Sequence, residues 1–121
     1  MARDFRNIKA WQHAYKLALG VYRETRSFPT REQYVITSQV RRAAASVAAN
    51  IAEGSSRTSD ADFSRFLEIA LGSLRETECF LMLAKDLEYL AADGFNGLAA
   101  QLDETARTLS GLIAAIRKKR E

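Results

Sequence analysis

Apolar side chains recur at intervals of three and four residues along most of this chain, which is the spacing of one face of an α-helix. Four segments carry this spacing, at about residues 8–26, 31–54, 60–90 and 94–118. No stretch combines the apolar-polar alternation of a strand with turn residues at its ends. The pattern therefore predicts an all-α chain with four long helices.

Each predicted helix should turn one apolar stripe toward a common core. On the first two helices the stripe positions are Ile8, Trp11, Tyr15, Ala18 and Tyr22, and then Ile36, Val40, Ala43, Val47 and Ile51. On the last two they are Phe63, Leu67, Ala70, Leu74, Thr77, Leu81 and Ala84, and then Leu98, Leu102, Ala106, Leu109, Ile113 and Ile116. The alanines of the second helix predict a close approach of its neighbours.

Capping and turn residues separate the first helices. Asn7 is the expected N-cap of the first helix, and Pro29 cannot continue its hydrogen-bond ladder. Thr30 and Gln33 have the spacing of a capping box that would open the second helix. Gly54 is the expected C-terminal stop of that helix.

The remaining boundaries leave equally short connections. Ser59 and Asp62 form a second capping box before the third helix, and Asp93 with Gly94 breaks the chain before the fourth. Because short connections make successive helices antiparallel neighbours, the sequence predicts an antiparallel, up-down-up-down four-helix bundle. The whole chain, residues 1–121, fits a single domain.

The third helix is more apolar than one bundle requires. Residues 79–84 are apolar on every side of the helix, and Phe66 and Ile69 lie off the main stripe. A bundle buries only a stripe, so the surplus predicts a contact with another subunit that includes Phe66 and Phe80. The alternative is a broad groove between the first and fourth helices that covers both faces.

Polar residues border the core on the second and third helices. On the second helix they are expected to fix the register of the bundle or a subunit boundary, and they are Arg42, Ser46, Asn50 and Glu53. Glu76 and Glu78 point about 160° apart on the third helix, so at least one should pair with an arginine of the second. Trp11 is expected to anchor the core or an interface.

The net charge of +3 is unevenly distributed. Residues 1–57 carry a net +6, residues 58–116 a net −6, and residues 117–121 a net +3. Besides scattered solvated charges, this polarity has two interpretations: a basic surface that attracts polyanions, or opposite faces that attract each other between copies of the chain. The residues expected to bind RNA or DNA backbone are Arg41, Arg42, Arg117, Lys118, Lys119 and Arg120. An ordinary helix end is the alternative for the basic tail, and the lack of a stacking platform or a helix-turn-helix predicts no base readout.

Few residues could support catalysis or metal binding. One cysteine and one histidine cannot build a Cys/His zinc site, and dispersed glycines form no phosphate loop. Cys79 is expected to be a buried small hydrophobe, and His13 a surface or boundary residue. The sequence thus predicts no catalytic residue, no metal and no cofactor, with a hydrolase centred on Glu53 as the one enzymatic alternative.

Five segments together carry a resemblance to a known family. They are Asp4-Phe5-Arg6-Asn7, Trp11-Gln12, Thr37-Ser38-Gln39-Val40-Arg41-Arg42-Ala43-Ala44, Asn50-Ile51-Ala52-Glu53-Gly54 and Ala70-Leu71-Gly72-Ser73-Leu74. In order and spacing they resemble the 23S ribosomal RNA intervening-sequence proteins. The resemblance implies antiparallel bundles assembled into five-membered rings, without enzymatic activity. It also implies a relation to the accessory variability proteins of diversity-generating retroelements, which bind nucleic acid and a reverse transcriptase.

Charge and resemblance together predict a non-enzymatic scaffold, a homopentamer, that binds RNA or DNA backbone through a basic surface without sequence readout. A protein-protein interaction module with no nucleic-acid role is the alternative. No window resembles a membrane span or a signal peptide, so a cytoplasmic protein without a membrane partner is expected. The family often has a proline near residues 47–49, where this chain has valine and alanine, so its second helix should be straighter.

Overall fold

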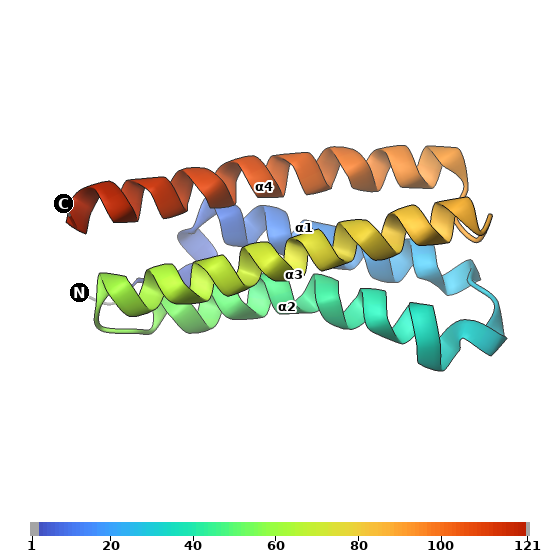
Figure 1. The fold of residues 1–121 in the computed structure, drawn as a ribbon, viewed down its shortest axis with the longest axis horizontal. Helices are drawn as coiled ribbons and strands as arrows, with labels where there is room; N and C mark the ends of the chain where they lie inside the picture. Colours follow the sequence, from blue (N-terminus) through green and yellow to red (C-terminus); the bar gives the residue numbers. More distant parts are fainter. Residues whose placement is uncertain (1–2, 121) are drawn as a thin grey trace.

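Four long helices account for most of the chain (Figure 1). The computed structural model describes residues 3–120, with side chains as far as residue 119. The long helices are α1 (Lys9–Glu24), α2 (Ser38–Ser55), α3 (Asp60–Asp86) and α4 (Ala92–Arg120), and residues 3–120 contain no strand. The helices lie side by side, and each connection lies at the opposite end of the bundle from the one before it (Figure 1). The prediction of an all-helical chain with four long helices is confirmed.

The order of the helices around the bundle follows from which helices touch. α1 packs on α2 and α4, and α3 packs on the same two helices. α1 and α3 are therefore diagonal to each other. Along residues 3–120, no helix is both long enough and apolar enough to cross a membrane.

The predicted core stripes of α2, α3 and α4 are confirmed. All of their positions are buried except Ala106, which is half-buried beside the core. The largest side chains with no exposed surface are aliphatic, and they include Leu17, Ile51, Leu67, Leu74, Leu81 and Leu109. Burial of this size is the main favourable term in the folding of a small domain.

The stripe predicted on α1 is only partly right: Ile8, Trp11 and Ala18 are half-buried against the core, but Tyr15 and Tyr22 are not. α1 buries Ala14, Leu17 and Val21, whereas Tyr15 and Tyr22 lie on its outer side. Both stripes have the same three-four spacing, so periodicity could not distinguish them. Side-chain size distinguishes them, because small residues permit a close approach to the alanine-rich α2, whereas an aromatic stripe would hold the two helices apart.

α2 begins at Ser38, later than the sequence predicts. The preceding residues form a 3₁₀ turn, Thr30–Glu32, and a single π-helical turn, Gln33–Thr37. Thr30 makes no capping hydrogen bond, because it lies inside the 3₁₀ turn and Pro29 occupies the cap position. The predicted capping box at this point is therefore wrong.

Of the other predicted helix boundaries, the start of α3 is confirmed, whereas the start of α1 and the end of α3 differ from the prediction. Asn7 lies within a short 3₁₀ helix and does not cap α1, whose N-cap residue is Ile8. The cap at Ser59 is confirmed, because its hydroxyl accepts the backbone N–H of Asp62 at 3.1 Å. α3 ends at Asp86 because Glu88 adopts a left-handed φ of 65°, so the break precedes the predicted one.

Gly54 brings α2 and α3 together and does not end a helix. α2 continues through Ser55, and a Cβ atom at Gly54 would lie 2.7 Å from the Cβ of Phe66 and 3.0 Å from Cδ1 of Phe63. Phe66 is accordingly buried between the two helices. Its predicted place on the surplus apolar face is wrong.

We expect Gly54→Ala to destabilise the bundle by about 1–3 kcal/mol, because the added methyl group overlaps two phenylalanines in a packed core. Gly72→Ala is the matched control, because a Cβ there meets no atom within 4 Å. It should stabilise the protein by about 0.5–1 kcal/mol through the higher helix propensity of alanine. Urea unfolding at one protein concentration measures both, and an unchanged midpoint for Gly54→Ala would contradict the close contact.

Candidate nucleic-acid interface

Most residues predicted to have register or interface roles lie on one outer surface, the α2–α3 face. Its members are Arg42, Ser46, Asn50 and Glu53 on α2, and Ser73, Glu76 and Phe80 on α3. The hydroxyls of Ser46 and Ser73 are 3.0 Å apart and join the two helices by a hydrogen bond. Asn50 donates to the backbone oxygen of Ser46 at 2.8 Å and to its hydroxyl at 3.0 Å.

Among these polar residues, Ser46 makes the contact that crosses between helices. Arg42 donates to the side chain of Gln39, and Glu53 pairs with Arg57 at 3.2 Å, so both contacts are local. Trp11 is half-buried at the edge of the core and stacks on Tyr15 with ring centres 4.8 Å apart. Its predicted role as an anchor is consistent with this position.

The predicted ion pair between α3 and an arginine of α2 does not occur within the described residues. Glu78 pairs instead with Arg75 of its own helix at 3.3 Å, and Glu76 is exposed. A carboxylate that stays in water avoids the desolvation penalty that a pair between helices would incur.

Two of the basic carboxyl-terminal residues pair with carboxylates of α3. Arg117 pairs with Glu68, and Lys119 lies 3.7 Å from the carboxylate of Asp60. The side chain of Arg120 lies outside the described residues, and Lys118 is exposed. This end of the bundle is opposite the start of α2 (Figure 1), so one chain does not join these residues to Arg41 and Arg42.

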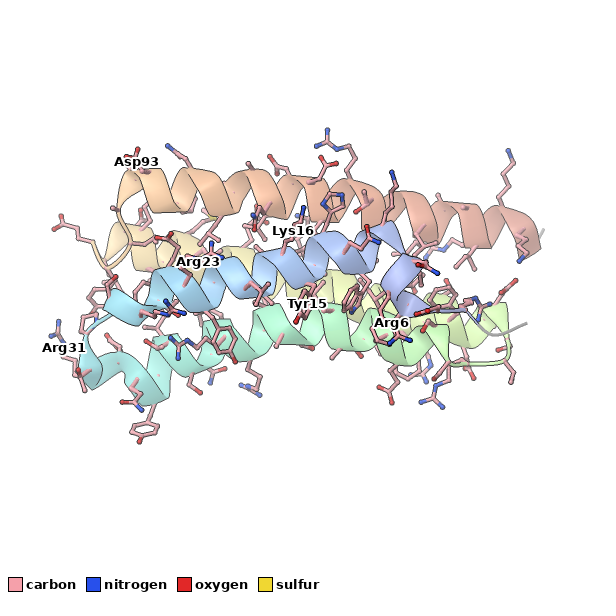
Figure 2. All side chains as sticks on the ribbon, turned by 180° about the vertical axis from the view of Figure 1, so that it is seen from behind. Arg6, Tyr15, Lys16, Arg23, Arg31 and Asp93 are labelled. Carbon is pink, nitrogen blue, oxygen red and sulfur yellow. The ribbon has the colours of Figure 1, made fainter. Side chains whose placement is uncertain are left out.

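A second set of cations lies where α1 passes into α2, and we call it the arginine cluster. Its members are Arg23, Arg26, Arg31, Arg41 and Arg42. None has a carboxylate of the described residues within ion-pair distance. Figure 2 shows Arg23 and Arg31 at this end of the molecule. The basic first half of the sequence indicates these arginines, but their clustering depends on the fold.

Arg41 holds the end of α1 in place. Its Nε donates to Thr25 Oγ1 at 2.8 Å, its Nη2 donates to the backbone oxygen of Tyr22 at 3.4 Å, and its guanidinium lies 4.8 Å from the centre of the Tyr22 ring. A cation is favoured at a helix C-terminus, where the carbonyl groups carry partial negative charge. Arg41 is thus part of the fold, whereas the neighbouring Arg42 is exposed and contacts only its own helix.

An open groove of about 710 Å³ lies between the end of α1 and the start of α2. Tyr22 and Tyr34 supply its aromatic surface, and Arg41 and Arg42 supply its charge. A hollow of about 170 Å³ that contains Arg26 shares Arg41 with this groove. The expectation that the protein lacks an aromatic platform beside its arginines is therefore wrong. Apolar spacing alone does not reveal this platform, because it predicts Tyr22 in the core.

Exposed apolar side chains form stripes on both diagonal helices. Tyr15 and Leu19 are about half exposed on α1, and Ile69 and Leu83 on α3 are similarly exposed, as is Leu87 directly after α3. No groove between α1 and α4 covers Ile69 and Leu83 in residues 3–120, because both side chains stay exposed and α3 packs mainly on α2 and α4. Two separate apolar surfaces are thus left on opposite sides of the bundle.

The few reactive side chains are dispersed. His13 lies 3.8 Å from Glu104 across the α1–α4 boundary, and Glu53 is exposed. Cys79 is exposed, so its predicted burial is wrong; it lies on the side of α3 that no helix covers. Hydrogen bonds from Arg6 lower the pKa of Asp4, which does not suit a general acid at neutral pH. Within residues 3–120 no three side chains are grouped as metal ligands.

Comparison with known proteins identifies the family. Residues 6–111 match the family model of the 23S rRNA-intervening sequence protein. This chain belongs to that family. A solved structure from Bacteroides thetaiotaomicron, described as a protein of unknown function from the S23 ribosomal protein family, is 28% identical with a TM-score of 0.75. The similarity covers 86% of this chain and 97% of that one, whereas no curated protein matches.

The comparison confirms the family that the five sequence segments indicate. The relation of this family member to the retroelement accessory proteins stays a prediction. A shared fold does not define a function, which has to be argued from the surface of this chain.

We expect Arg41→Ala to lower the free energy of unfolding by about 0.5–1.5 kcal/mol, because it removes the hydrogen bonds that hold the end of α1. Arg42→Ala, its neighbour on the same helix, should change that energy by less than about 0.5 kcal/mol. Thermal or urea unfolding of both variants measures the difference. If both variants were destabilised equally, Arg41 would not have the structural role that distinguishes it from Arg42.

Proposed function

We propose that this protein is a non-enzymatic, oligomeric scaffold that binds the phosphate backbone of RNA or DNA through the arginine cluster. The observation that carries the proposal is the asymmetry of pairing. At the carboxyl-terminal end Arg3, Arg117 and Lys119 have carboxylate partners, whereas the arginines of the cluster have none within the described chain. Phosphates would relieve the repulsion among these arginines and release their own counterions.

The proposed binding reads no base sequence. The cluster draws its arginines from the end of α1, from the connection and from the start of α2, and it does not align them along one helix that could enter a groove of a duplex. Contacts to phosphates position a protein on nucleic acid but carry no sequence information. Residues 117–120 would join this surface only across a boundary between subunits.

The assembly proposed for the scaffold is a ring, and the number of five subunits comes from the family resemblance. A ring requires head-to-tail contacts between two different surfaces of the chain. The diagonal stripes on α1 and α3 offer two such surfaces. Residues 1–57 are net basic and residues 58–116 net acidic, so opposite charges would meet in such a contact.

A protein-protein interaction module without nucleic acid is the second candidate. The exposed Leu83 and Leu87 at the end of α3 favour it, because apolar side chains at a surface often mark a protein contact. The proposed relation to the retroelement accessory proteins would supply both a nucleic acid and a protein partner. Either function suits the cytoplasm, which is the compartment we propose.

We expect random-sequence RNA to bind with an affinity that falls steeply as salt rises, because each phosphate contact releases counterions. Replacing Arg26, Arg31 and Arg42 together with glutamine should weaken binding about tenfold or more and reduce the salt slope by about 0.7 per lost contact on single strands. Fluorescence anisotropy at several salt concentrations provides the measurement.

The control variant replaces Arg65, Arg75 and Arg107 with glutamine, which changes the net charge by the same amount. Each of these arginines already pairs with a carboxylate three residues away. Equal weakening by both variants would show that net charge alone matters and would contradict a site at the arginine cluster. Absence of binding at low salt would remove the nucleic-acid role and leave the protein module.

We expect Leu83→Glu to shift the protein toward single chains, because it places a carboxylate on a stripe proposed to be covered in the ring. Met82→Glu makes the same change on the side of α3 that faces α4, and it should leave the assembly intact. Sedimentation velocity gives the mass, and five times the chain mass of 13.5 kDa is expected for the wild type. A wild-type protein that stays a single chain at high concentration would contradict the ring.

A further inference from the structure

The most exposed large apolar side chain of the described residues belongs to the groove beside the arginine cluster. Tyr34 leaves 86% of its surface in water, and it lies in the π-helical turn, Gln33–Thr37, that precedes α2. None of the described aromatic rings stacks on it. The fold gains little from this ring, since burial of aromatic surface is what stabilises a core.

The second tyrosine of the groove has a defined orientation. Tyr22 is anchored by the guanidinium of Arg41, which lies 4.8 Å from the centre of its ring. The same guanidinium is fixed to Thr25 and to the end of α1 by hydrogen bonds. The groove therefore combines one tyrosine in a fixed position with one that projects from its rim.

The π-turn leaves a polar group without a partner in the wall of the groove. The buried hydroxyl of Thr37 makes no hydrogen bond, and Thr37 lines both the groove and the adjoining hollow that contains Arg26. An unsatisfied buried hydroxyl costs about 1–3 kcal/mol. π-turns of this kind are rare and occur often at functional sites.

An aromatic face beside arginines suits an unpaired nucleic-acid strand. In a duplex the faces of the bases are stacked on one another, whereas a single strand can turn a base onto a tyrosine while its phosphates contact cations. Arg42 lines the groove that contains the tyrosines, and Arg26 lines the adjoining hollow, so cations are present in both.

We propose that this groove binds single-stranded RNA or DNA in preference to duplex, with an unpaired base stacked on Tyr34 and the flanking phosphates held by Arg26 and Arg42. This inference rests on the proposed function, because it specifies the form of nucleic acid that the arginine cluster takes. Every base can stack on an aromatic ring, so the groove should prefer single strands over duplex without preferring a particular base sequence.

The test compares a labelled single strand of about 20 nucleotides with a duplex of the same length, at one salt concentration and by fluorescence anisotropy. The wild-type protein should bind the single strand more tightly. Tyr34→Ala should weaken single-strand binding about tenfold, which lies within the range for loss of one stacked base. The same variant should leave duplex binding unchanged within about twofold, because no base stacks on Tyr34 in the duplex complex.

Two further variants separate stacking from folding. Tyr34→Phe keeps the ring and should retain wild-type binding. Val35→Ala changes a neighbouring side chain that is also exposed, and it should have no effect on either nucleic acid. Unfolding midpoints close to the wild-type value would show that Tyr34→Ala has not disturbed the bundle.

The possible failures are distinguishable. If Tyr34→Ala binds the single strand as tightly as the wild type while the triple arginine variant does not, the stacking inference is overturned and the backbone site stands. If polyglutamate displaces the strand as well as unlabelled nucleic acid does, the groove takes acidic protein segments and the inference is also overturned. If neither nucleic acid binds at low salt, both the inference and the proposed function fall.

Discussion

Close packing around α2 determines what else the bundle can bury. Gly54 and the alanines of this helix remove side-chain volume, so α3 approaches until Phe63 and Phe66 cover the glycine. A core at this spacing accepts aliphatic side chains and small residues from α1 but leaves Tyr15 and Tyr22 outside. The tyrosines are therefore left at the surface. The surface on which the proposed function rests is in this sense a consequence of the core.

The charges are organised along the length of the bundle. At the carboxyl-terminal end, acidic residues of α3 pair with Arg3, Arg117 and Lys119. These pairs partly compensate the positive charge of that end. At the other end the arginines hold helix ends and tyrosine rings but meet no carboxylate of residues 3–119. Exposed ion pairs contribute little to stability, so this arrangement matters mainly for which surface attracts anions.

The sequence predicts the bundle well because on three of its helices the predicted apolar stripe is the buried one, and the stripe of α3 is buried at every predicted position from Phe63 to Ala84. It fails on α1 because two stripes share the same spacing, and only the size of the side chains that fit against the neighbouring helix decides which stripe is buried. It also fails at Glu88 and in the turn before Ser38, since a left-handed residue and a π-turn have no counterpart in apolar spacing. The candidate site could be predicted only in part: Arg41 and Arg42 stand out as a pair, whereas their meeting with Tyr22 depends on how α1 ends.

Hydrogen exchange measured with and without a single-stranded oligonucleotide tests most directly whether the arginine cluster is the binding surface. The account predicts slower exchange in peptides that cover residues 22–42, which include the end of α1, the connection and the start of α2. It predicts unchanged exchange rates in residues 57–68 and 110–119, which lie at the opposite end of the bundle, where several cations already have carboxylate partners. Protection confined to the carboxyl-terminal end, or binding that protects neither region, would contradict it.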